Sequence, residues 1–145
     1  MIRLKVARLE GRESVDTEVI IDVMEANASG GSTFPEAVGR LLGAGVESYF
    51  ADLARGEETF YGADGTTHSE AMELECGAVS DEFSQAGLVA AIRGAQADAV
   101  RYPEFVRLAT AAGVAGYWAF LTGRKVVYFG RKGEMHVEEF PGARN

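Results

Sequence analysis

A segment in the first half of the chain recurs 68 residues later without a gap. Over positions 34–70, 13 of the 37 residues are identical to their counterparts at 102–138, where roughly two or three identities are expected by chance. The matches include prolines, glycines, a Tyr-x-Ala-x-Leu set and a His-x-Glu set. Because each copy must build the same unit, the repeat predicts two equivalent halves that arose by internal duplication.

Two helices are predicted at the start of each half. Apolar residues follow the helical period at about 15–28 and again at about 84–98. A second helix follows each of these segments. Pro35 and Pro103 fit its first turn, where the missing N–H group of proline costs nothing.

Strands are predicted after the second helix of each half. Gly45 and Gly113 fit the left-handed residue that ends a helix, and the apolar period then changes to two. Each half therefore reads as a three-stranded meander, whose third strand spans 66–72 or 134–140, with Gly123 in a hairpin turn. The predicted fold class is α+β, a duplicated helix–helix–β-meander unit with a mostly antiparallel sheet and helices packed on one face.

The domain organisation follows from the repeat. Residues 13–145 are predicted to form a single domain of two repeats, about 13–75 and 80–142. Residues 1–12 lie outside the repeat and are expected to form an edge strand or an extension. The edge-strand alternative depends on the alternation of three apolar residues, Ile2, Leu4 and Val6.

Composition limits the classes of function. The net charge is −8, and residues 13–82 contain only Arg40 and Arg55 as basic side chains. Most of this surface would repel a phosphate backbone, so we expect no nucleic-acid partner. The apolar runs are too short for a membrane span, the N-terminus lacks the pattern of a secretory signal, and the single Cys76 fits a reducing compartment. We therefore expect a cytoplasmic protein with no membrane partner and no cofactor.

The motifs of the two halves resemble those of a known family. Phe-Pro-Glu…Ala-Gly-Val…Tyr and Tyr-Gly-x-Asp-Gly in the first half are followed by Tyr-Pro-Glu-Phe…Ala-Gly-Val-x-Gly-Tyr…Leu-Thr-Gly-Arg…Tyr-Phe-Gly…Val-Glu-Glu-Phe-Pro in the second. This pattern resembles the YbcV-like family of uncharacterised bacterial and prophage proteins over about residues 15–142, most specifically over 112–141. The resemblance implies a duplicated α+β fold and an association with phage, and it carries over no catalytic or binding residues.

The only two histidines occupy equivalent positions, and each begins a His-x-Glu sequence: His68 with Glu70, and His136 with Glu138. At strand spacing, the histidine and the glutamate of each pair share one face. If the two pairs met at a pseudo-two-fold axis, they could bind a divalent metal or act as general acid and base. The alternative interpretation is that they are solvated strand residues inherited from the duplication.

The orientation of the second pair can also be predicted from its strand. Met135 and Val137 alternate with His136 and Glu138. The two apolar residues are expected to face the core, which would turn the histidine and the glutamate towards water.

Aromatic residues suggest an interaction surface. Phe50, Trp118 and Phe120 are predicted on the strand face opposite the shared Tyr-x-Ala-x-Leu set. If helices cover one face of the sheet only, these rings form the interface of a homodimer or a binding groove. The alternative is that the sheet curls and buries them internally.

These observations leave three functions open. A non-enzymatic binding or interaction module fits the aromatic strand face best. A metal-dependent or acid/base enzyme would use His68, Glu70, His136 and Glu138, so whether the protein is an enzyme stays undecided at this point. A phage-related structural component is implied by the family resemblance alone.

Overall fold

The computed structural model describes residues 15–141, which form four helices and one six-stranded antiparallel sheet. The elements in chain order are α2 (Thr17–Ala28), α3 (Phe34–Gly43), β1 (Val46–Asp52), β2 (Glu57–Gly62), β3 (Thr67–Ala71), α4 (Gln85–Gln96), α5 (Tyr102–Ala111), β4 (Val114–Phe120), β5 (Lys125–Gly130) and β6 (Met135–Glu139). The predicted α+β class is confirmed. The edge strand or extension predicted at residues 1–12 lies outside the described residues.

The two halves contain the same elements in the same order. Every element from α4 to β6 begins and ends 68 residues after its counterpart in the first half. The three strands of each half form a meander, as predicted. That the halves arose by duplication of one ancestral unit stays a prediction.

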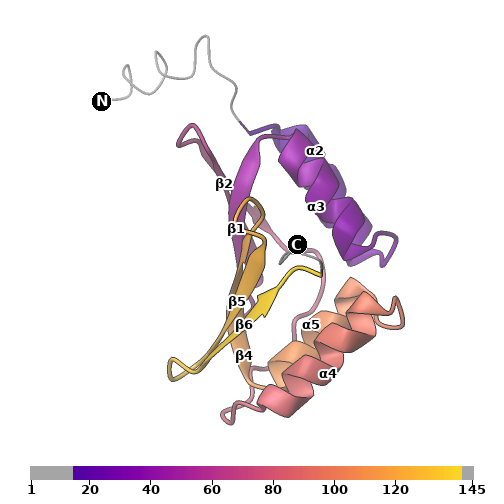
Figure 1. Cartoon of the computed structure of the whole chain (residues 1–145), viewed down its shortest axis with the longest axis vertical. Helices are drawn as coiled ribbons and strands as arrows, with labels where there is room; N and C mark the ends of the chain where they lie inside the picture. Colours follow the sequence, from indigo (N-terminus) through magenta and orange to yellow (C-terminus); the bar gives the residue numbers. More distant parts are fainter. Residues whose placement is uncertain (1–14, 142–145) are drawn as a thin grey trace.

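The helices form one layer and the sheet forms another (Figure 1). The strand order is β3-β2-β1-β4-β5-β6, so the halves join in the middle of the sheet and the third strand of each half becomes an edge. Within residues 15–141, all four helices lie against the same face, which confirms the prediction of a one-sided helical layer (Figure 1). We call the other face the open face.

The pairing of β1 with β4 relates the halves by an approximate two-fold axis. Phe50 pairs with Trp118, which is its own counterpart in the repeat. Moving outwards, Tyr49 pairs with Ala119 and Ala51 pairs with Tyr117. The pairing of β1 with β2 has the same register as that of β4 with β5, 68 residues later, including an irregularity near the start of β1 and β4. The pairing of β2 with β3 likewise matches that of β5 with β6.

Local sequence signals place the helix ends. The Asp16 side chain accepts hydrogen bonds from two backbone N–H groups at the start of α2, and Ser84 caps α4 in a similar way. Thr33 and Glu36 form a reciprocal capping box at the start of α3. Pro35 and Pro103 lie in the first turns of α3 and α5, as predicted. These interactions satisfy backbone groups that a helix end leaves without partners.

The core lies between the helices and the inner face of the sheet. Alternate residues of the central strands point into it, among them Ala51 and Ala119, which are fully buried on either side of the two-fold axis. Each helix contributes at least one residue with almost no exposed surface: Ile20, Leu41, Leu88 and Val106. No helix of the described chain is long and apolar enough to cross a bilayer.

The turns follow the prediction. Gly45 and Gly113 have φ angles of 87° and 92°, as expected for residues that end helices in the left-handed region. The β1–β2 turn uses Gly56 at φ 70°, and its counterpart in the second half is Arg124 at φ 61°. Gly123 lies within this second hairpin turn, as predicted, next to Arg124.

The space around Gly113 predicts a strong steric requirement for glycine. Gly113 and Gly133 have nearly the same φ, 92° and 91°, but only at Gly113 would an added Cβ collide with the backbone of Glu82 and Phe83. We expect Gly133→Ala to lower the free energy of unfolding by about 1–2 kcal/mol, the cost of left-handed backbone for an L-residue. Gly113→Ala should cost at least about 2 kcal/mol more, because the Ser84 N–H bond to Ala112 O holds the colliding segment in place. Urea denaturation measures both variants, and equal losses would contradict the steric argument.

Candidate functional site

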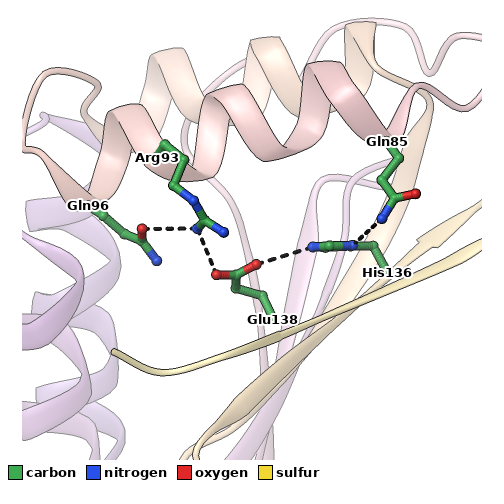
Figure 2. Close-up of polar contacts among 5 residues, drawn as sticks. All are labelled: Gln85, Arg93, Gln96, His136 and Glu138. Atoms are coloured by element: carbon green, nitrogen blue, oxygen red, sulfur yellow. Dashed lines mark hydrogen bonds and ion pairs between the residues drawn. The ribbon is translucent and has the colours of Figure 1, made fainter. Parts of the chain in front are cut away.

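The second His-x-Glu pair belongs to a polar network between β6 and α4 (Figure 2). His136 Nε2 lies 3.2 Å from Glu138 Oε1, and Gln85 Nε2 lies 3.0 Å from His136 Nδ1. Arg93 Nη1 donates to Glu138 Oε2 at 2.7 Å and to Gln96 Oε1 at 3.0 Å. The arrangement fits the histidine tautomer that carries its proton on Nε2, because Gln85 can then donate to Nδ1.

This network fixes the charge of Glu138. Burial acts to raise the pKa of the carboxyl, but hydrogen bonds from Arg93 and His136 outweigh burial and lower the pKa below its ordinary value. The carboxylate is therefore ionised and neutralised by a guanidinium from its own chain.

The predicted orientation of this pair is wrong. The His136 and Glu138 side chains are 13% and 17% exposed and face the helices, whereas Met135 and Val137 are exposed on the open face. β6 is an edge strand that lies beneath the polar side of α4, so its polar residues find hydrogen-bond partners there. The apolar alternation of the strand therefore does not mark its core side.

The first His-x-Glu pair is simpler and more exposed. His68 Nε2 lies 2.7 Å from Glu70 Oε1, and the two side chains are 26% and 35% exposed. In α2, the residue at the position of Arg93 is Glu25, so this half places no guanidinium there.

The two pairs do not meet at one site. β3 and β6 are the opposite edges of the six-stranded sheet, and adjacent strands are about 4.8 Å apart. Within residues 15–141, no group of three or more His, Cys, Asp or Glu side chains is arranged to hold a metal ion. The fold therefore does not form a single metal site shared by His68, Glu70, His136 and Glu138. A ligand-binding or proton-transfer role for either pair alone stays a prediction.

A buried polar cluster that the sequence did not reveal lies near the centre of the sheet. Glu58 on β2 is 3% exposed, and its Oε2 atom accepts a hydrogen bond of 3.0 Å from the Tyr102 hydroxyl of α5. The Tyr102 and Tyr117 hydroxyls lie 2.6 Å apart, and the Tyr49 ring lies against that of Tyr117. We call these four residues the Glu58 cluster.

The repeat contained a signal for this cluster. The counterpart of Glu58 in the second half is Val126, and the counterpart of Tyr102 is Phe34. Both members of the hydrogen-bonded pair are thus apolar in the other half. The second half folds with an apolar residue at the position of Glu58. The fold itself therefore does not require a carboxyl group at this strand position.

The environment of Glu58 favours its protonated form. Burial raises the pKa of this carboxyl to about 7, and the Tyr102 hydrogen bond opposes part of that effect. Burial also raises the pKa values of Tyr49, Tyr102, Tyr117 and the nearby Cys76 thiol. These neighbours therefore remain neutral where Glu58 titrates. No cation among the described residues offsets the charge of its ionised form.

One comparison identifies the family. The sequence model of a family described as proteins of unknown function (DUF1398) matches residues 22–139, most of the chain. The chain belongs to the DUF1398 family. The match includes both His-x-Glu pairs and the Glu58 cluster. No curated protein matches the chain significantly.

In this DUF1398 chain, the predicted aromatic residues do share one face of the sheet. Phe50 and Trp118 pair across the centre with ring centroids 5.3 Å apart, and Trp118 stacks with Phe120 at 5.6 Å. Tyr61 also stacks against Trp118, with ring centroids 5.6 Å apart. All four rings are half-buried by one another, and no described helix covers them (Figure 1).

The raised pKa of Glu58 predicts a pH-dependent stability. The folded-state value is about 7 against 4.5 for the free group, so the folded protein binds this proton more tightly. Stability should fall as pH rises from about 4.5 to about 7, by an amount of order 3 kcal/mol. We expect Glu58→Gln to lose this contribution, so the stability difference between the variant and the wild type should change across that window in urea unfolding.

Glu57→Gln is the matched control for this measurement. It makes the same change one residue away, on the open face, where the Glu57 carboxylate lies 3.4 Å from the exposed Arg55 guanidinium. Identical pH profiles for Glu58→Gln and the wild type would contradict the assignment.

Proposed function

We propose that the protein is a non-enzymatic interaction module that associates with a second copy of itself through the open face of the sheet. The observation that carries this proposal is the unequal chemistry of that face. On β4, β5 and β6, six of its positions hold large apolar side chains: Trp118, Phe120, Val127, Phe129, Met135 and Val137. We call these six residues the apolar half of the open face.

The first half of the same face is more polar. At the six corresponding positions, four side chains are polar, Asp52, Thr59, Thr67 and Ser69, and two are aromatic, Phe50 and Tyr61, which both lie against Trp118. The apolar half is therefore a localised patch, and at its edge Met135 and Val137 are 60% and 49% exposed. Exposed apolar patches of this kind mark interaction surfaces in small proteins.

A second copy of the chain has side chains that can cover the apolar half of the open face. Lys125 and Glu139 are neighbours across β5 and β6 at one end of the apolar half. A two-fold axis that runs along the strands between β5 and β6 brings each lysine opposite the glutamate of the other copy, and each Val127 opposite the other Val137. An isologous interface requires this kind of self-complementarity.

The enzyme alternative has weaker support. Each His-x-Glu pair contains one imidazole and one carboxylate, and at His136 both ring nitrogens are already engaged by side chains of the same chain. A YbcV-like, phage-related structural role remains the third proposal. It would use the same open face in a larger assembly.

The oligomeric state of paired variants tests the proposal. Val137 and Ser69 are counterparts, both exposed on the open face, one on each edge strand. We expect a wild-type dimer at tens of micromolar in analytical ultracentrifugation, a monomer for Val137→Glu and a dimer for Ser69→Glu, because a carboxylate is costly only where it is buried against apolar groups. A monomeric wild-type protein, or an equal effect of the two variants, would overturn the self-association.

A further inference from the structure

A small cavity opens beside the Glu58 cluster, between α2 and the segment that follows β3. Its volume is about 10 Å³. A cavity of this size holds one group of the size of a water molecule. Most of its walls come from three residues of α2 and three after β3: Met24, Asn27 and Ala28, then Met72, Glu73 and Leu74. Glu58 and Tyr102 complete its lining.

Glu58 presents an uncompensated carboxyl to this cavity. The side chain is 3% exposed, and among residues 15–141 its hydrogen-bond partner is the neutral Tyr102 hydroxyl. An ionised carboxylate in such a place is costly unless a cation accompanies it. Because the other half of the fold places Val126 and Phe34 at the two counterpart positions, packing alone does not explain the polar pair.

The second half shows how this scaffold neutralises a half-buried carboxylate. There Arg93 of α4 donates to Glu138, and both side chains belong to the same chain (Figure 2). In the first half, α2 has no basic residue in its last turn, and Glu25 stands at the position of Arg93. Among the described residues, Glu58 and Glu73 line the cavity and no basic residue does, because the nearby Arg101 pairs with Asp98 and donates to the Gly30 carbonyl.

We propose that this cavity binds the terminal ammonium group of a primary amine, with the Glu58 carboxylate as its anionic partner. The size of the cavity admits an ammonium group and excludes a quaternary one. Glu58 and Glu73 repel anions, and the absence of a three-ligand group in residues 15–141 argues against a metal ion. Asn27, Tyr102, Met24 and Met72 also line the cavity, and amide, aromatic and thioether groups suit an N–H cation on an alkyl chain.

Methylammonium chloride is the probe for this site, titrated into the whole protein at pH 8 and followed by amide chemical shifts in NMR. Sodium chloride is exchanged for the probe so that ionic strength stays constant. We expect saturable shifts at residues 24–28 and 72–74, and no such shifts with tetramethylammonium. Shifts that do not saturate, or that tetramethylammonium reproduces, would overturn the proposal.

Two variants separate the site from general charge effects. Glu58→Gln should weaken methylammonium binding at least about tenfold, the equivalent of about 1.4 kcal/mol, while Glu57→Gln on the open face should leave it within about twofold. Equal affinity of Glu58→Gln and the wild type would overturn the proposal.

Ala28→Gln tests the cavity in a second way, because it leaves the Glu58 carboxyl unchanged. The other half already holds Gln96 at this position, so the fold tolerates the longer side chain. We expect Ala28→Gln to fill the cavity and abolish the saturable shifts, and retention of full affinity in this variant would also overturn the assignment.

Discussion

The antiparallel pairing of β1 with β4 is the interaction on which the rest of the structure depends. Phe50 and Trp118 face each other across this pair, so each strand meets its own counterpart and the two meanders continue outwards in opposite directions. This arrangement makes one continuous six-stranded sheet from two three-stranded units. It also places all four helices on one side, and within residues 15–141 no helix covers the other side (Figure 1).

The same pairing determines how the chemistry is distributed. Because β3 and β6 become opposite edges, the two His-x-Glu pairs are separated by four intervening strands. Each pair then acquires its own surroundings: α4 supplies Arg93 and Gln85 to the second pair, and Glu25 occupies the place of Arg93 on α2. A symmetric backbone therefore carries two unequal sites.

The inequality extends through the core and the open face. Glu58 and Tyr102 replace an apolar pair, Val126 and Phe34, and form a buried hydrogen bond beside a cavity. On the open face, the apolar side chains gather on the strands of the second half. Differences between copies are informative here because the shared positions already account for the fold. Positions at which the two halves differ in chemistry are therefore candidates for roles other than packing.

The sequence predicted the elements well because their signals are local. First-turn prolines, the glycines at 45 and 113 and the change of apolar period each act over a few residues, so helix and strand positions could be read directly. Gly123 was read as part of the second hairpin turn in the same way and lies there, beside Arg124, which has the left-handed conformation.

The sequence could not decide which side of an edge strand faces the core, and there its prediction for β6 was reversed. Met135 and Val137 looked like core residues, but the polar face of α4 lies above His136 and Glu138 and offers them partners. The repeat marked Glu58 and Tyr102 as differences between the copies, but that they meet could not be read from the sequence, since they are 44 residues apart and come together only in the folded chain. By itself the sequence determined the elements and their repetition, because those depend on local backbone preferences and apolar period. Only the tertiary structure decided which side chains meet, because that depends on how the helical layer lies over the sheet.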